Sequence, residues 1–528
     1  MNIKQAKEYI KDSVKLYLKK DDEGEYRIPV VRQRPIFLLG APGIGKTAVM
    51  EQIAQELGIA IVSYSMTHHT RQSALGLPFI AHKEFEGLSY DVSEYTMSEI
   101  IASIYDVMSE SGIKEGIFFL DEINCVSETL APSMLQFLQY KVFGRHRVPD
   151  GWVIVTAGNP PEYNKSVREF DIVTLDRMKI LEVEAEYQVW KEYAKDRNIH
   201  TAILNYLDLK KEDFYQVETT VRGKNYITAR GWEDLSAMML LYEEEGMSVE
   251  ESLIEQYIRN PRVVKEFGAY YDLYRKYQKD YRVADILAGT APASAGERAR
   301  KADFDERLSL MGMLIDYVQH DIRENIEQYE YINNILNHMK AIKNSVGADK
   351  DVIGSNKDSV ELSKGNLESD RGRLKDRIAD ILENQISGRE KGMESLMKAG
   401  SLSDREKRKQ KKVIRFLTDC EKALKQEEID DADAALKFLK ARYDDEAALY
   451  KSETQDIKMK LHYLFTFVED TFGTGNEMLI LLTECTVNKD SAKFIGMYGC
   501  DEYKRHNEEL MVSERGDTIM EEIARLEL

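Results

Sequence analysis

Two patterns of hydrophobic and polar residues alternate along the first third of the chain. Stretches with apolar residues at helical spacing separate short, continuous apolar runs, which are bounded by glycine, proline or charged residues. Continuous runs of this length predict strands buried on both faces of a parallel sheet, and we expect five of them, near residues 36–39, 59–65, 116–120, 152–157 and 179–184. Strands that alternate with helices predict an α/β fold with a doubly wound parallel sheet over residues 34–185.

Outside this region the periodicity is helical almost throughout. An amphipathic helix and its lead-in are expected over residues 1–33. After the sheet we expect an all-α lid domain over 186–286, a linker rich in small residues over 287–304 and an extended helical C-terminal region over 305–528. The basic run REKRKQKK at 405–412 can bind an anionic partner or form a solvated helix face, and the flanking acids favour the solvated face.

The composition limits the classes of protein to which this chain can belong. The 528 residues suffice for about three domains of roughly 150 residues each. With 93 acidic against 73 basic residues the formal charge is −20, which disfavours nucleic-acid binding over the whole surface and leaves only a local basic groove for it. No apolar run approaches the roughly 18 residues of a membrane span, and the charged N-terminus is unlike a signal sequence, so we expect a cytoplasmic protein. The four cysteines have no C-x-x-C spacing and predict neither disulfides nor a zinc site.

A glycine-rich segment joins the first strand to the helix after it. The sequence GAPGIGKT at 40–47 fits G-x-x-x-x-G-K-[ST] in that context. The glycines let successive backbone N–H groups curl inward, and the following helix adds the positive end of its dipole, so the segment predicts a polyphosphate site. We expect binding by the whole loop, that is by Gly40, Ala41, Pro42, Gly43, Ile44, Gly45, Lys46 and Thr47. Lys46 is expected to reach the phosphates, and the Thr47 hydroxyl to ligate magnesium.

Two further strands end in polar residues. GIFFLDEIN at 116–124 places Asp121 and Glu122 after four apolar residues, so that both acids emerge beside the phosphate loop. We expect Asp121 to hold magnesium through water and Glu122 to polarise the attacking water. GWVIVTAGNPPEYN ends near Asn159, which can orient the same water, although an asparagine after a strand is more often a turn former.

These segments, in this order and with LDRM at 175–178 and TARGWEDL at 228–235, resemble the MoxR-type AAA+ ATPases over about residues 30–270. The resemblance implies ATP and Mg²⁺ as cofactors, sensor 1 at Asn159, the arginine finger at Arg177 and sensor 2 at Arg230. Two positions depart from the family pattern, since Met178 replaces a phenylalanine and Ala229 replaces a proline. Arg168, in SVREF, is a rival for the arginine finger.

The segment LPFIAHKEFEGLSYDV at 77–92 has two strand-like pieces around a charged turn. The family resemblance implies a β-hairpin inserted here that faces the pore of a ring, with Phe85 as a contact for a substrate or partner. The alternative is a surface hairpin with an exposed aromatic residue. His68 and His69 precede it without a carboxylate at ligand spacing, so we expect no metal there.

The function implied by this resemblance is that of a ring-forming, most often hexameric, ATP-hydrolysing protein that remodels or matures a protein partner. MoxR-type relatives commonly work with a separate protein that carries a von Willebrand A domain. This sequence lacks the D-x-S-x-S motif of such a domain, so another chain would supply it, and the helical C-terminal region would select the partner. The alternatives are a nucleic-acid-dependent AAA+ motor, which the charge disfavours, and a nucleotide-switched scaffold.

Overall fold

The chain divides into two compact units. Unit 1 comprises residues 1–199, 211–261 and 389–408, and unit 2 comprises residues 200–210, 262–388 and 409–528. The computed structural model describes residues 1–68, 74, 76–143, 146–164, 167–220, 223–355, 365–426 and 432–509, so that His69, expected not to bind a metal, lies outside the described residues. The units cut across the segments expected from the sequence, because residues 211–261 and 389–408 pack with the sheet.

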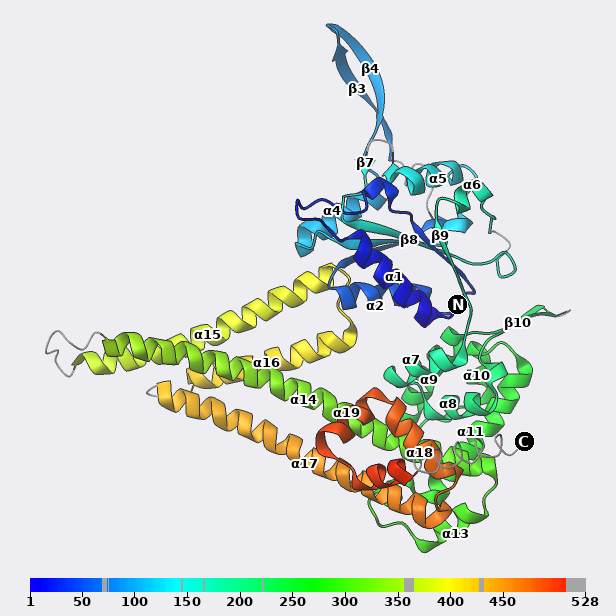
Figure 1. The fold of residues 1–528 in the computed structure, drawn as a ribbon, viewed down its shortest axis with the longest axis vertical. Coiled ribbons are helices and arrows are strands. Elements are labelled where there is room, and N and C mark those ends of the chain that lie inside the picture. Colours follow the sequence, from blue (N-terminus) through cyan, green and yellow to red (C-terminus); the bar gives the residue numbers. More distant parts are fainter. Residues whose placement is uncertain are drawn as a thin grey trace, which may run out of the picture. The chain divides into compact units, whose positions relative to one another are not determined.

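Unit 1 is built on a five-stranded parallel sheet with the strand order β2-β5-β8-β1-β9 (Figure 1). The strands are β1 (Ile36–Gly40), β2 (Ala60–Ser65), β5 (Gly116–Asp121), β8 (Trp152–Gly158) and β9 (Lys179–Val183). All five strands predicted from the sequence are therefore confirmed. Every neighbouring pair is parallel, so the carboxyl ends of the strands meet at one edge of the sheet.

Helices cover both faces of this sheet, as the continuous apolar runs require. Phe118 of β5 packs in a core with α4 and α5, whereas its neighbour Phe119 packs in a second core with α1 and α2. Successive residues of a strand point to opposite faces, so a strand buried on both faces loses the polar alternation of a surface strand. The helices of unit 1 include α1 (Ile3–Tyr17), α2 (Lys46–Leu57), α4 (Glu99–Ser111), α5 (Ala131–Tyr140), α6 (Ile172–Leu175), α7 (Tyr187–Asp196), α9 (Ala229–Glu244) and α10 (Glu251–Tyr257).

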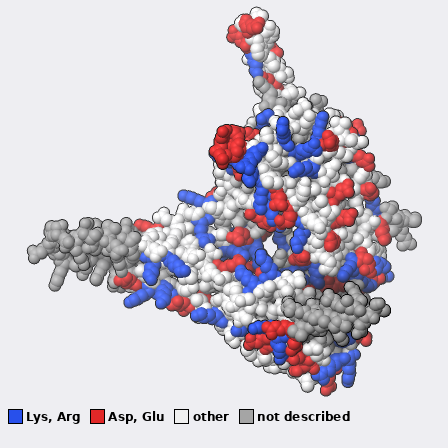
Figure 2. Space-filling model, viewed as in Figure 1, with Lys and Arg blue, Asp and Glu red and all other residues white. Residues whose placement is uncertain are grey.

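The predicted hairpin stands away from the sheet in Figure 1 as β3 (Pro78–Phe85) and β4 (Leu88–Tyr95). Glu86 and Gly87 form its turn, and both have positive φ, as a two-residue type I′ hairpin turn requires. Figure 2 shows acidic side chains at its tip. A second, much shorter hairpin, β6 (Val142–Phe143) and β7 (His146–Arg147), was not expected from the sequence.

The expectation of helices alone over residues 186–286 is wrong in one respect. An antiparallel pair, β10 (Gln216–Thr220) and β11 (Gly223–Ile227), lies between α7 and α9. The segment QVETT carries a valine and two threonines, and β-branched residues favour extended backbone over helix. The predicted helical periodicity resumes at α9.

Unit 2 is helical throughout its described part. Its helices are α8 (Thr201–Leu209), α11 (Pro261–Tyr281), α12 (Val283–Leu287), α13 (Ala293–Lys301), α14 (Phe304–Ser355), α17 (Ala432–Phe472), α18 (Asn476–Val487) and α19 (Lys489–Tyr498), with most of α15 (Gly365–Lys398) and α16 (Asp404–Gln426). The predicted helical C-terminal region is confirmed. The predicted linker at 287–304 is wrong, because α13 occupies half of it, with Ala295 and Ala299 buried.

Four of these helices form a bundle. Apolar residues of α14, α15, α16 and α17 share one core, which includes Ile335, Leu382, Leu417 and Leu439. Part of the basic run at 405–412 is used within the chain, because Lys409 forms an ion pair with Glu330 at 2.7 Å and Lys412 donates to Gln328. No helix in the described part of the chain is long and apolar enough to cross a membrane.

Packing of α1 on the sheet predicts a large stability effect. The Ile10 side chain is fully buried among α1, α2 and the sheet, so Ile10→Ala should lower the free energy of unfolding of unit 1 by about 2–5 kcal/mol. Leu16→Ala, at a position 56% exposed on the same helix, should change it by less than about 0.5 kcal/mol. All three tryptophans lie in unit 1, so denaturation followed by tryptophan fluorescence measures this unit. Equal losses in the two variants would contradict this account of α1.

Candidate nucleotide-binding site

The loop between β1 and α2 has the backbone of a phosphate site. Gly43 and Gly45 have φ of +76° and +91°, a region that glycine adopts without a steric penalty. Gly45 is the residue that precedes the first turn of α2, so the free N–H groups of that turn adjoin the loop. This arrangement can bind a chain of phosphates, as the sequence predicts.

Lys46 is folded back onto the loop. Its ammonium donates to the carbonyl oxygens of Gly40 and Ala41 at 2.7 and 2.9 Å, and to Asn159 Oδ1 at 2.8 Å. Burial lowers the pKa of Lys46 to about 8, against the opposing effect of Asp121. Among the described residues no carboxylate contacts this buried ammonium directly, and the phosphates of a nucleotide would supply the counter-charge.

The two residues expected to ligate magnesium lie together. The Thr47 hydroxyl donates to Asp121 Oδ2 at 3.0 Å, from the start of α2 to the end of β5. A hydroxyl and a carboxylate are oxygen ligands of the kind that Mg²⁺ takes alongside nucleotide phosphates and water. The residues present therefore fit a magnesium ion at this point.

Glu122 has an unusual backbone conformation, and its side chain contacts a residue that the sequence did not single out. Its φ of +55° and ψ of +37° lie in the left-handed region, which is uncommon for a residue with a side chain. Its carboxylate accepts a hydrogen bond from Ser65, at the end of β2, at 3.0 Å. Strain of this kind persists where surrounding contacts hold it, often at functional sites. The signal for Ser65 in the sequence is only its place at the end of a strand next to β5.

Asn159 lies next to Lys46, as the strand order predicts. It follows β8, and its backbone carbonyl accepts from the amide of Asn124, a residue buried after β5. A Cβ on Gly158 would lie 2.5 Å from Asn124 Oδ1, so a glycine is required for this close approach. The contact fixes the loop after β8 against the loop that carries Glu122.

The start of α9 packs directly on the phosphate loop. A Cβ on Gly43 would lie 3.1 Å from Thr228 Cβ and 3.6 Å from Arg230 Cβ. Thr228 begins the helix, since its hydroxyl accepts from the N–H of Gly231 at 3.1 Å. The structure therefore brings Arg230 to the loop. Tyr215, which sequence reasoning missed, also reaches it by donating to Pro42 O at 3.0 Å.

Arg177 lies away from these groups. It precedes β9, whose first residue, Lys179, pairs with Ile36 at the amino end of β1. The phosphate loop leaves the other end of β1, four residues or about 13 Å further along the strand. Arg177 is exposed and donates to Gln139 of α5 at 2.6 Å. The rival Arg168 pairs with Glu128, and its N–H donates to Asn124 O at 2.9 Å.

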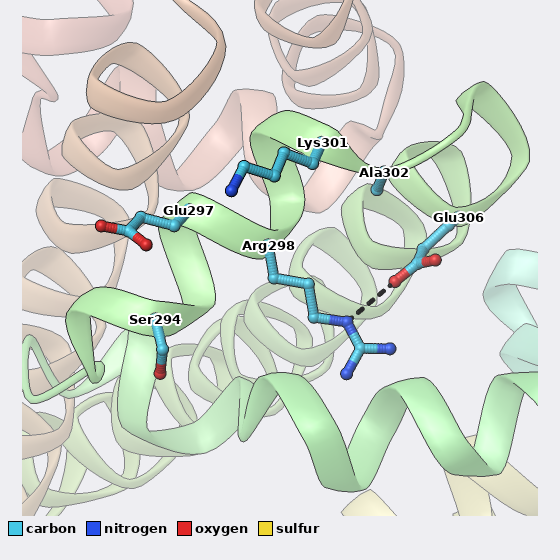
Figure 3. Close-up of a pocket in the computed structure, with 6 residues that line it drawn as sticks. All are labelled: Ser294, Glu297, Arg298, Lys301, Ala302 and Glu306. Carbon is cyan, nitrogen blue, oxygen red and sulfur yellow. Dashed lines mark hydrogen bonds and ion pairs between the residues drawn. The ribbon is translucent and has the colours of Figure 1, made fainter.

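Unit 2 contains a hollow to which no residue of the phosphate loop contributes (Figure 3). Side chains of α13 and of the start of α14 line it, and Arg298 points toward Glu306 with an Nε–O distance of 3.1 Å. Arg298 also pairs with Asp280 at 2.6 Å. Two carboxylates thus already balance its charge, which makes the hollow a poor anion site.

Comparison with known proteins agrees with the site. Residues 36–174 match the model of the AAA family, the ATPase family associated with various cellular activities, so this segment is an AAA ATPase domain. Among solved structures, a RuvB mutant from Thermotoga maritima is similar at 17% sequence identity and a TM-score of 0.21, over 36% of this chain and 52% of that one. The chain thus spans about half the length of that protein. None of the curated proteins matches the chain.

The buried Lys46 predicts a pH effect on nucleotide binding. With a pKa of about 8, the ammonium of the free chain loses its proton as the pH rises through 8. Phosphate binding favours the charged form, so affinity for ADP should be constant below pH 8 and fall by up to about tenfold per pH unit above it. Isothermal titration calorimetry between pH 7 and 9.5 measures this fall and the proton uptake that accompanies it.

Lys46→Arg is the matched control, because a guanidinium stays charged throughout this range. Its ADP affinity, whatever its absolute value, should not depend on pH above 8. An equal decline in both proteins would assign the effect to another group.

Proposed function

We propose that the chain is an ATPase that couples hydrolysis of ATP, with Mg²⁺, to the remodelling or maturation of a protein partner. The observation that carries the hydrolytic part is the meeting of Lys46, the Thr47–Asp121 pair and Glu122 at one edge of the sheet. The AAA family match over the same segment supports adenine nucleotide as the substrate class.

Each residue has a distinct part in this proposal. The N–H groups of the loop from Gly40 to Thr47 bind the phosphates, and Lys46 turns from the loop carbonyls to the phosphate oxygens. Thr47 and Asp121 would hold Mg²⁺ with their side-chain oxygens. When bound, the metal ion neutralises charge that develops on the phosphates.

Glu122 orients and polarises the attacking water once Ser65 releases its carboxylate, and Asn159 fixes the same water from the neighbouring strand. Arg230 reaches the phosphates from α9, which ties the position of that helix to the nucleotide. A site that only bound nucleotide would not need Glu122 held ready in a strained conformation, which favours hydrolysis over a nucleotide-switched scaffold.

The β3–β4 hairpin is the surface we propose for the protein partner. Phe85, Leu88 and Tyr90 lie on one face of the ribbon and are 54%, 62% and 48% exposed. The His146 ring lies 3.4 Å from the Tyr95 carbonyl at the foot of the ribbon, so the β6–β7 hairpin supports it. An apolar ribbon with an acidic tip suits a polypeptide better than a nucleic acid.

Partner type and assembly are drawn from the MoxR resemblance. It implies a separate protein with a von Willebrand A domain and a hexameric ring, and it implies that Arg177 acts on the nucleotide of a neighbouring subunit. The position of Arg177 at the far end of β1 from its own phosphate loop supports this last point, as does the 84% exposure of Ile172, five residues earlier in the chain. A nucleic-acid-dependent motor is the alternative, and DNA-stimulated turnover would favour it.

Two substitutions test the division between binding and hydrolysis. Lys46→Ala should abolish ATP binding, because the phosphates lose their buried counter-charge. Glu122→Gln should leave ATP affinity within about twofold and lower kcat at least about a hundredfold, as expected for loss of a general base. Calorimetry and a phosphate-release assay measure the two quantities. Loss of binding in both variants to the same degree would show that Glu122 does not have this role, and tryptophan fluorescence checks that unit 1 remains folded.

Mixed assemblies test whether Arg177 acts between subunits. Arg177→Ala and Lys46→Ala should each be inactive, whereas a mixture should recover part of the activity, because some interfaces pair an intact loop with an intact arginine. An arginine finger contributes about 10³ to 10⁵ in rate in related phosphoryl transfers, so recovery is measurable over a low background. Full activity of Arg177→Ala at concentrations where the chain is monomeric would exclude the mechanism, and no recovery despite co-assembly would favour Arg168.

A further inference from the structure

The turn between α15 and α16 docks on the edge of the sheet in unit 1. Residues 389–408, the end of α15 and the start of α16, belong to that unit (Figure 1). The N–H of Ile61, on the edge strand β2, donates to Ala399 O at 2.9 Å. The Ser395 hydroxyl donates to the carbonyl of Ser111, at the end of α4. We call residues 395–403 the tip.

The tip is built to fit this place. Ala399 is fully buried in the core that α4 and β2 share. Gly400 has a φ of +68°, and a Cβ there would lie 3.0 Å from Ile61 Cγ2 and 3.2 Å from Ile61 O. Glycine is thus required both for the backbone conformation and for the close approach. Ser403 begins α16 by accepting from the N–H of Glu406 at 3.2 Å.

Two features of the tip limit the stability of its docked state. A single backbone hydrogen bond joins the tip to β2 among the contacts between described residues. The Ser401 hydroxyl is buried and finds no hydrogen-bond partner in the described part of the chain. An unsatisfied buried hydroxyl opposes docking, because its lost hydrogen bonds to water are not replaced.

The strand that the tip touches also holds Glu122. β2 runs from Ala60 to Ser65, so the contact at Ile61 and the hydrogen bond from Ser65 to Glu122 are four residues apart on one strand. Side chains at positions i and i+4 of a strand lie on the same face. A shift of β2 at Ile61 would reach Ser65, and with it the hydrogen bond to Glu122, along a single strand.

The two helices that carry the tip are anchored in unit 2. Ile378, Leu382 and Ile386 of α15, with Leu417 and Leu424 of α16, lie in the core of the four-helix bundle. The helices then continue without a break past residues 388 and 409, where the units meet along the chain. Continuous helix thus connects the core of the bundle to the tip.

We propose that the tip is a positioning element for Glu122. Docked on β2, it keeps Ser65 hydrogen-bonded to the Glu122 carboxylate and hydrolysis slow; when unit 2 withdraws it, Ser65 releases Glu122 and hydrolysis accelerates. This inference rests on the proposed ATPase function and adds its control by the helical region.

The test uses the full chain with Gly400→Val, and with Gly400→Ala and Ser395→Ala as milder variants. Undocking should speed exchange of the Ile61 amide hydrogen by about tenfold or more, since Ala399 no longer covers it. We expect kcat for ATP to rise about fivefold or more, with KM and ADP affinity unchanged. In a Ser65→Ala chain, which already lacks the restraint, Gly400→Val should raise kcat no further.

Gly473→Ala is the matched control, because Gly473 has nearly the same φ, +67°, with nothing within 4 Å of an added Cβ. It should leave the Ile61 amide and kcat unchanged. The inference is overturned if Gly400→Val or the milder variants expose the Ile61 amide without changing kcat, or if their effect is as large in the Ser65→Ala chain.

The wild-type chain separates this inference from the proposed function. If it binds ATP without hydrolysing it, the proposed function fails, and reciprocal linkage gives the remaining test. Addition of ATP should then change exchange at Ile61, and an amide that does not respond to the nucleotide would overturn the inference as well.

Discussion

The parallel register of the sheet is the constraint on which the site depends. Leu39 pairs with Gly158, Leu120 with Thr156 and Ser65 with Asp121, so four strands reach one edge at the same level. The phosphate loop, Asn159, the acids after β5 and Ser65 follow from strand ends and need no further element to bring them together. A slip of one residue in any pair would separate these groups and turn apolar side chains toward the wrong core.

The sequence was most informative where structure is local. A glycine loop between an apolar strand and a helix dictates its own backbone, which is why the sequence predicts that Lys46, Thr47 and Asp121 lie close together. The five strands could be predicted for a similar reason, because strands buried on both faces are continuous apolar runs in the sequence. For α13 and the β10–β11 pair, by contrast, small or β-branched residues carry a weak local preference, and packing decided the outcome.

Contacts between distant parts of the chain could not be predicted. Tyr215 and Ser65 are an ordinary tyrosine and serine until the fold brings them to Pro42 and Glu122. The sequence around Gly400 is typical of a glycine that ends a helix. Only the structure shows that this glycine packs against Ile61, on a strand far away in the sequence. The roles of Arg177 and of the hairpin remain predictions, because they depend on other chains.

The β3–β4 ribbon has a consequence for solubility. In the described part of the chain both of its strands have an unpaired outer edge, and such edges can recruit a strand from another molecule and start aggregation. Charges oppose this on the polar face, where His82 stands opposite Asp91, and at the turn, where Glu84 and Glu86 repel the same turn in a second copy. These charges therefore oppose polymerisation of the ribbon through its backbone, although its apolar face stays exposed.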